Sequence, residues 1–124
     1  MAHVMIIDDD QYVRSVVKQM LEAAGYVVTE ASSGREGIEK HEENPADLII
    51  TDIIMPDEGG LETIMKLKRD YPKIKIIAIS GGGRIVQVDF LDIAKNLGVV
   101  RTMQKPLERA ELLEAVAEAL ALPE

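Results

Sequence analysis

The stretch VMIIDDD, residues 4–10, decides the fold and raises the question of function. Its four apolar residues are typical of a short strand that is buried on both faces of a parallel sheet. Three consecutive aspartates follow directly. Carboxylates a few ångströms apart repel one another, and the repulsion pushes one of them toward protonation. A protein that gathers acids at a strand end therefore needs something that offsets this repulsion.

The bulk composition predicts one globular domain over residues 1–124. The chain is 47% apolar, which argues against disorder, and its length suffices for a hydrophobic core. Its net charge of −8 disfavours direct nucleic-acid binding, because the phosphate backbone would repel it. It has no cysteine, and we find no signal peptide and no apolar run of about 18 residues that could span a membrane. These features predict a soluble, cytoplasmic protein without membrane contact.

Short apolar runs alternate with amphipathic segments along the chain. The apolar runs predict strands over residues 4–7, 26–31, 47–51, 74–80 and 99–103. Helical spacing of apolar residues predicts helices over residues 13–24, 33–44, 60–70, 86–97 and 112–120. This alternation predicts an α/β fold, a three-layer (βα)5 doubly wound parallel sheet with right-handed crossovers.

Local signals mark two helix starts. Asp10 is expected to cap the first helix, where the positive end of the helix dipole favours an acid. Ser33 and Glu36 have the spacing of a capping box. Gly34 and Gly37 argue against the second helix, because glycine costs about 1 kcal/mol in a helix interior.

Neither histidine is expected to carry chemistry. We interpret His3 and His41 as surface or strand-end residues. His41 falls on a helix away from the strand ends, so we do not expect it to donate a phosphoryl group.

Residues that could form a charged site follow four of the five predicted strands, whereas the second is followed only by Ser32 and Ser33. The residues that could form the site are Asp8 and Asp9 after the first, Asp52 after the third, Ser80 after the fourth and Lys105 after the fifth. In open α/β sheets, ligands bind beyond the carboxyl ends of the strands. These side chains are therefore expected to converge on one edge of the sheet and form a chemical site.

The residue types at this edge suit a phosphoryl site with Mg²⁺. Carboxylates without cysteine or paired histidines favour a hard cation, and Mg²⁺ typically takes one or two carboxylates together with phosphate oxygens. A lysine and a hydroxyl beside the metal would stabilise charge on a transferring phosphoryl group. The bound cation would also offset the repulsion among the aspartates.

From end to end, the chain resembles the receiver domain of two-component response regulators. The resemblance is carried by Asp8-Asp9, by TDIIMP (residues 51–56), by GLE (residues 60–62), by Ser80 and by Lys105-Pro106. Each motif is weakly specific alone, but all of them in order at strand ends are highly specific. The resemblance implies a flavodoxin-like sheet with strand order 2-1-3-4-5.

The resemblance also implies a magnesium site. Asp9 and Asp52 would ligate Mg²⁺ directly, together with the main-chain carbonyl of Ile54. Asp8 would act mainly through a metal-bound water.

The phosphoryl group would come from a histidine kinase or a histidine phosphotransfer protein. The resemblance implies that Asp52 is the phosphoacceptor, that Lys105 pairs with the phosphoryl group and that Ser80 moves inward to hydrogen-bond it. It implies a cis peptide bond between Lys105 and Pro106. A downstream output protein or domain would then meet the changed face formed by residues 86–97 and 99–103.

The sequence departs from the family pattern at three places, one of which is Glu58-Gly59-Gly60, where receivers commonly have Met-Asp-Gly. Thr102 stands three positions before Lys105, where receivers usually have an aromatic residue that reports phosphorylation. The usual coupling of Ser80 to an aromatic side chain is therefore not expected here. Three glycines, Gly81 to Gly83, follow Ser80 where the family usually has alanine first.

Other functions remain open from the residues alone. Asp8-x-Asp10 looks like the nucleophile motif of haloacid-dehalogenase-type phosphatases, which also use Mg²⁺, although the further acidic pair of that family is missing. A receiver used only for docking is disfavoured by the intact set of acids, hydroxyl and lysine. Nucleotide binding at Gly81 to Gly83 is disfavoured because no Gly-Lys-Ser/Thr sequence follows.

The residues two positions after Asp52 and Ser80 predict a long-lived phosphorylated state. In the family these positions flank the attacking water, and here Ile54 and Gly82 offer no acid or amide to orient it. We expect decay of the phosphorylated protein, followed by intact mass, to be slower than in receivers with polar residues there. Decay as fast as theirs would contradict this prediction.

Overall fold

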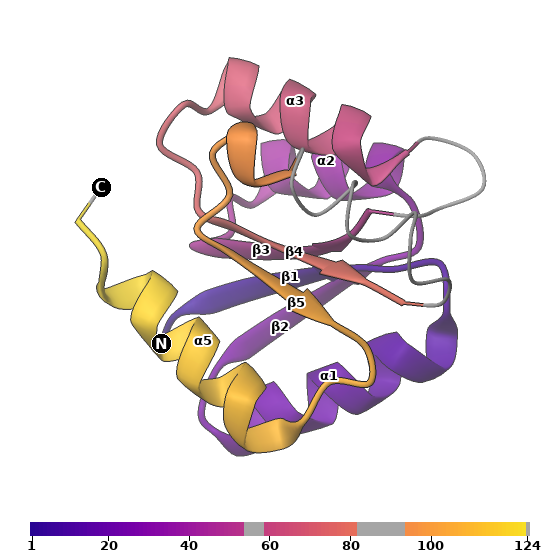
Figure 1. The fold of residues 1–124 in the computed structure, drawn as a ribbon, viewed down its shortest axis with the longest axis vertical. Coiled ribbons are helices and arrows are strands. Elements are labelled where there is room, and N and C mark those ends of the chain that lie inside the picture. Colours follow the sequence, from indigo (N-terminus) through magenta and orange to yellow (C-terminus); the bar gives the residue numbers. More distant parts are fainter. Residues whose placement is uncertain (54–58, 82–93, 124) are drawn as a thin grey trace.

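Strands and helices alternate along the described chain, as predicted (Figure 1). The computed structural model of the protein describes residues 1–53, 59–81 and 94–123. Its strands are β1 (His3–Ile7), β2 (Val27–Ala31), β3 (Leu48–Asp52), β4 (Ile76–Ser80) and β5 (Arg101–Gln104). Its labelled helices are α1 (Gln11–Ala23), α2 (Gly34–Glu43), α3 (Gly60–Asp70) and α5 (Arg109–Ala121). Most of the predicted helix over residues 86–97 lies outside the described residues.

The sheet has the predicted topology. Its strand order is β2-β1-β3-β4-β5, and every neighbouring pair is parallel. Ile7 pairs with Thr51, Asp52 pairs with Ile79, and Ser80 pairs with Gln104. Because of this register, the residues that follow β1, β3, β4 and β5 reach the same edge of the sheet.

Helices cover both faces of the sheet, which explains the continuous apolar runs of its strands. In Figure 1, α1 and α5 lie on one face and α2 and α3 on the other. Alternate residues of each strand point to opposite faces and enter two core clusters. The cluster on the α1 and α5 side includes Val4, Ile6, Ile50, Ile77, Leu21 and Val116, and the cluster on the other side includes Met5, Ile7, Ile49, Ile76, Ile64 and Leu67.

Four strands, β2 to β5, begin one or two residues later than their predicted ranges. In β2, β4 and β5 the backbone N–H of the first apolar residue bonds back to the preceding helix or turn and not across the sheet. These bonds join Tyr26 to the carbonyl of Leu21, Ile74 to that of Tyr71 and Val99 to that of Ala94.

Side chains cap α1 and α2 as predicted. Asp10 accepts a hydrogen bond from the Tyr12 amide at 2.9 Å, and Ser33 accepts one from the Glu36 amide at 3.1 Å. The Glu36 carboxylate reaches back to Ser32 and accepts from its amide at 2.5 Å. This bond lowers the pKa of Glu36, although partial burial opposes the shift. The capping box therefore closes one residue earlier than its usual form.

The two glycines of α2 are explained by close packing. A Cβ atom at Gly34 would lie 1.9 Å from Thr63 Oγ1, and one at Gly37 would lie 2.4 Å from Ile7 Cδ1. The absence of side chains lets α2 approach α3 and the sheet. This tertiary packing outweighs the low helix propensity of glycine.

The prediction that His41 is a surface residue is wrong. Its side chain is 2% exposed, its Nδ1 accepts a hydrogen bond from the Ala46 amide at 3.0 Å, and its ring packs edge-to-face against Tyr71. The chain after α2 folds back over the imidazole, and the end of α3 closes it from the other side. Burial lowers the pKa of His41, and the charge of His3 lowers it further. His3 itself stands at the start of β1, as predicted.

Among the described helices, none combines the length and the apolar character that a membrane span requires.

We predict that stability falls as the pH drops below about 6.5, the ordinary pKa of histidine. The unfolded chain binds a proton at His41 near this pH, whereas the folded chain binds it only at a lower pH. Above about pH 6.5, His41 should therefore not reduce the free energy of unfolding. Below this pH, protonation of His41 in the unfolded chain should lower the free energy of unfolding by at most about 1.4 kcal/mol per pH unit.

Urea unfolding at a series of pH values measures this effect. His41→Gln should flatten the profile between about pH 6.5 and 5.5, whereas His3→Gln removes only the smaller cause of the shift and should retain most of the slope. Identical profiles for the wild type and His41→Gln would contradict the prediction.

Candidate functional site

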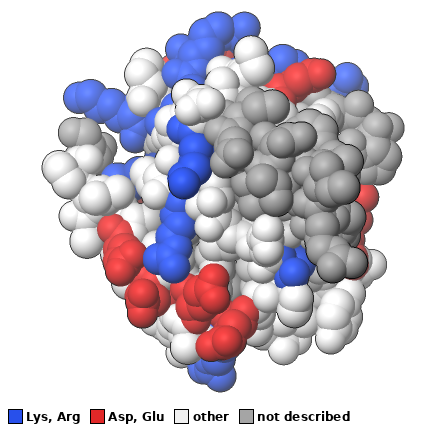
Figure 2. Space-filling view, viewed as in Figure 1, with Lys and Arg blue, Asp and Glu red and all other residues white. Residues whose placement is uncertain are grey.

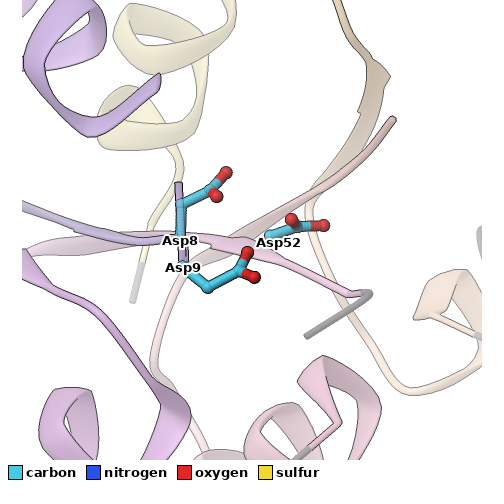
Figure 3. Close-up of side chains that lie close together, drawn as sticks. All are labelled: Asp8, Asp9 and Asp52. Carbon is cyan, nitrogen blue, oxygen red and sulfur yellow. The ribbon is translucent and has the colours of Figure 1, made fainter. Parts of the chain in front are cut away.

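Three aspartates meet at the carboxyl edge of the sheet. Carboxylate oxygens of Asp8, Asp9 and Asp52 all lie within 4.8 Å of one another (Figure 3). Asp8 is fully buried and Asp52 is 4% exposed, whereas Asp9 is exposed. The structure therefore brings together the acids that follow β1 and β3, as the sequence predicts.

Lys105 joins this cluster from the end of β5. Its Nζ lies 2.8 Å from Asp8 Oδ2 and 3.2 Å from Asp52 Oδ2. Burial lowers the pKa of Lys105, but the contact with Asp8 and the charge of Asp52 outweigh burial, so the net shift is upward. The lysine is therefore a cation that neutralises part of the charge of the acidic cluster.

Asp8 is also held from two sides through other atoms. Its backbone amide donates to the Ala31 carbonyl at the end of β2, at 3.1 Å. Its Oδ1 accepts from the Asp10 amide at 2.9 Å. Because Asp10 in turn caps α1, its carboxylate is directed to the helix and not to the cluster.

Ser80 lies at the end of β4, and its hydroxyl is buried without a hydrogen-bond partner among the described residues. An unpaired buried hydroxyl costs about 1–3 kcal/mol relative to a paired one. This atom is the kind of unsatisfied donor that a bound ligand could pair. The neighbouring Lys105 amide donates to the Ser80 carbonyl at 2.7 Å, which ties the end of β5 to the end of β4.

Two glycines let backbone and side chains approach closely here. A Cβ atom at Gly60 would lie 2.2 Å from the Asp52 carbonyl oxygen, so the first residue of α3 must be a glycine for the helix to begin beside Asp52. A Cβ atom at Gly81 would lie 2.7 Å from Lys105 Cδ, so the lysine stem runs across this glycine toward the acids.

The structure tests some of the remaining features that the resemblance implies around β5 and the loops beside the site. The peptide bond between Lys105 and Pro106 is cis, as the resemblance implies. Thr102 lies in β5 and pairs with Ala78, so no aromatic side chain occupies the usual position. Ile54 and Gly82 lie outside the described residues, and the predicted carbonyl ligand is therefore not part of the geometry above.

The donor set fits a magnesium ion. The three carboxylates supply hard oxygen ligands close enough to share one cation, and Asp9 is accessible from solvent. Lys105 stands beside them, where a phosphate oxygen on the metal would need a partner, and Ser80 ends the neighbouring strand β4 with an unpaired buried hydroxyl. The prediction of a metal and phosphoryl site is consistent with this arrangement.

Comparison with known proteins decides the family. The family model described as "Response regulator receiver domain" matches residues 4–117. The chain belongs to the response regulator receiver family. Chemotaxis protein CheY of Thermotoga maritima is 33% identical over 114 residues, which cover 91% of this chain and 92% of that protein.

Other receivers agree in sequence and in fold. The DNA-binding transcriptional regulator NtrC of Azospirillum brasilense is 31% identical over 119 residues, which cover 96% of this chain but 24% of that protein. A CheY-like receiver domain protein from Methanospirillum hungatei superimposes with a TM-score of 0.89 at 31% identity, covering 97% of this chain and 94% of that one.

The haloacid-dehalogenase-type alternative is not supported. The family match assigns the chain to receivers, and Asp10, which that alternative would use for catalysis, caps α1 through its side chain. The receiver is a signalling domain of two-component systems.

A pocket of about 770 Å³ opens at the opposite edge of the sheet. Its lining includes His41, Tyr71, Lys73 and Lys75, and none of the acids described above. The acids of the receiver site lie at the carboxyl edge, away from this pocket.

We predict opposite effects on stability for two buried hydroxyls. Ser80→Ala removes an unpaired polar atom and should raise the free energy of unfolding by about 1 kcal/mol. Thr51→Val is the matched control, because the Thr51 hydroxyl donates to the Asp52 carbonyl at 3.1 Å and its loss should lower stability by about 1 kcal/mol. Urea unfolding without Mg²⁺ measures the free energy of unfolding of both variants. A clear loss of stability in Ser80→Ala would contradict the conclusion that the Ser80 hydroxyl is unpaired.

Proposed function

We propose that the chain accepts a phosphoryl group on Asp52 in a Mg²⁺-dependent reaction and thereby switches a partner-binding face. The observation that carries this proposal is the position of the Asp52 carboxylate. It lies at the end of the central strand, within 4.8 Å of the acids of the β1 end and 3.2 Å from the Lys105 ammonium. The carboxylate is thus presented between metal ligands and a cation.

Transfer would proceed by displacement at phosphorus. A carboxylate oxygen of Asp52 forms a bond to phosphorus while the bond from phosphorus to the donor histidine nitrogen breaks, and the imidazole keeps the electron pair. The product is an acyl phosphate on Asp52. Lys105 pairs with the charge of the transferring group, and Ser80 donates its hydroxyl to one phosphoryl oxygen.

Magnesium would be held by Asp9 and Asp52, with the main-chain carbonyl of Ile54 and with Asp8 acting through water. The metal would neutralise charge on the phosphoryl oxygens and orient them. On this account Asp8 holds Lys105 in the unphosphorylated state, since their ion pair is the shorter of the two that the ammonium makes.

The switch would begin at Ser80 and Lys105. Their backbones are joined by the hydrogen bond between the Lys105 amide and the Ser80 carbonyl, so a movement of either residue displaces the ends of both β4 and β5. With threonine at position 102, the signal would pass through these strand ends without an aromatic side chain. The protein would catalyse only its own phosphorylation and dephosphorylation.

Partners follow from the family. The donor is a histidine kinase or a histidine phosphotransfer protein, and the output is a downstream protein or domain. Acidic side chains gather over α5 on the face shown in Figure 2, and basic side chains lie beside them. Arg101 of β5 and Glu118 of α5 form an ion pair at 3.0 Å. A partner would therefore meet a surface of mixed charge beside β5.

Phosphorylation by a small donor tests the proposal. Incubation of the wild type with Mg²⁺ and acetyl phosphate should add the mass of one phosphoryl group, and Asp52→Asn should abolish this addition. Asp10→Asn is the matched control, because asparagine caps a helix as well as aspartate does and the adduct should persist. An adduct that survives in Asp52→Asn but is lost in Asp10→Asn would refute the assignment.

A further inference from the structure

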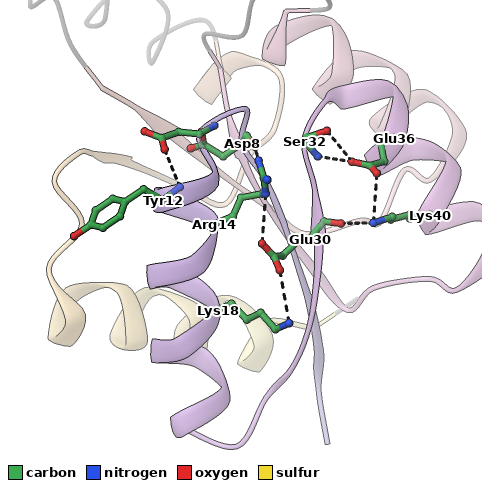
Figure 4. A network of polar contacts seen from close by, with 9 residues as sticks. Asp8, Tyr12, Arg14, Lys18, Glu30, Ser32, Glu36 and Lys40 are labelled. Atoms are coloured by element: carbon green, nitrogen blue, oxygen red, sulfur yellow. Dashed lines mark hydrogen bonds and ion pairs between the residues drawn. The ribbon is translucent and has the colours of Figure 1, made fainter.

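The peptide unit that joins Asp8 to Asp9 is held by an arginine of α1. Arg14 Nη1 donates a hydrogen bond to the Asp8 carbonyl at 2.6 Å (Figure 4). Side chains in a helix point back toward its N-terminus, which lets Arg14 reach the turn that precedes α1. Its side chain is 15% exposed. The bond therefore restricts rotation of the peptide unit that aims the Asp9 side chain.

Glu30 of β2 orients this arginine. Its Oε1 lies 3.4 Å from Arg14 Nε, and its Oε2 lies 3.6 Å from Lys18 Nζ. The main-chain carbonyl of Glu30 accepts a hydrogen bond from Lys40 Nζ at 2.5 Å, which fixes the strand against α2. Figure 4 shows this network running from α2 across β2 to the turn after β1.

Asp8 is held by further contacts besides the hydrogen bond from Arg14. The Asp8 amide is bound to β2 and its Oδ1 to the Asp10 amide, while its Oδ2 lies beside Lys105. Arg14 supplies the contact to the remaining polar atom, the carbonyl oxygen. The β1–α1 turn is thus fixed before any ligand binds.

We propose that Arg14, oriented by Glu30, is a positioning residue that presets Asp8 and Asp9 for magnesium binding. The inference rests on the proposed magnesium site. Because the β1–α1 turn is already ordered, it loses little conformational entropy when the metal binds, and less of the binding free energy is used to order it. Outer groups that hold metal ligands in place typically change metal affinity 10–100-fold when removed.

The charge of Arg14 makes this inference testable by the sign of the effect. A guanidinium close to the acidic cluster repels an incoming cation, so charge alone predicts tighter Mg²⁺ binding when Arg14 is replaced by a neutral residue. Positioning predicts weaker binding. The two explanations therefore differ in direction as well as in size.

Isothermal titration calorimetry of the full chain with Mg²⁺ alone measures this directly. Arg14→Met should weaken Mg²⁺ binding about tenfold, and Arg14→Lys, which keeps a donor, should lose less. Lys18→Met is the matched control, since Lys18 pairs with Glu30 but does not hold the Asp8 carbonyl, which Arg14 does. It removes the same charge and should leave Mg²⁺ binding unchanged or slightly tighter.

Glu30→Gln tests the second half of the inference. It should weaken Mg²⁺ binding in the wild-type background and have little further effect in Arg14→Met, because Glu30 acts through the arginine. Additive effects would show that Glu30 acts through its own charge. Unfolding in EDTA shows whether each variant is folded under the conditions of the titration.

The outcomes separate this inference from the proposed function. Unchanged or tighter Mg²⁺ binding by folded Arg14→Met, with a wild type that binds and is phosphorylated, would overturn the positioning role and leave the proposed function standing. A wild type that does not bind Mg²⁺ would overturn both.

Discussion

The ammonium of Lys105, 2.8 Å from Asp8 and 3.2 Å from Asp52, is the contact on which the rest of the site depends. Two carboxylates that are almost fully buried face each other at the sheet edge, and burying a charge without a partner is costly. The lysine offsets this cost from a third strand. The parallel order β2-β1-β3-β4-β5 is what brings these strand ends together.

The site has features that make it ready for a ligand at the expense of stability. The Ser80 hydroxyl is buried without a partner among the described residues, and three acids share a small volume. Around them the backbone is firmly held, because Gly60 lets α3 start against Asp52 and the Asp8 turn is bound through several atoms. A rigid frame with unsatisfied groups is suited to binding and releasing a charged group.

Much of this arrangement could be predicted from the sequence. Alternating apolar runs predicted the sheet, and the acids and the lysine at strand ends predicted which side chains meet. His41 could not be predicted, because its burial depends on Ala46 and Tyr71, which reach it only in the folded chain. The strand starts were misplaced because apolar residues such as Tyr26 bond back to the preceding helix.

Arg14 was missed for a different reason. Its role depends on a single bond to a main-chain carbonyl, and no motif marks that contact. The available signal was its position early in a helix that follows the acids, from which a long side chain can point back to the turn.

A crystal structure with Mg²⁺ and the phosphoryl mimic beryllium trifluoride tests the central claim most directly. The account predicts the mimic on an Asp52 oxygen, with the Lys105 ammonium and the Ser80 hydroxyl bound to its fluorides and the metal beside Asp9 and Asp52. A mimic on another carboxylate, or one on Asp52 that neither the lysine nor the serine contacts, would contradict it.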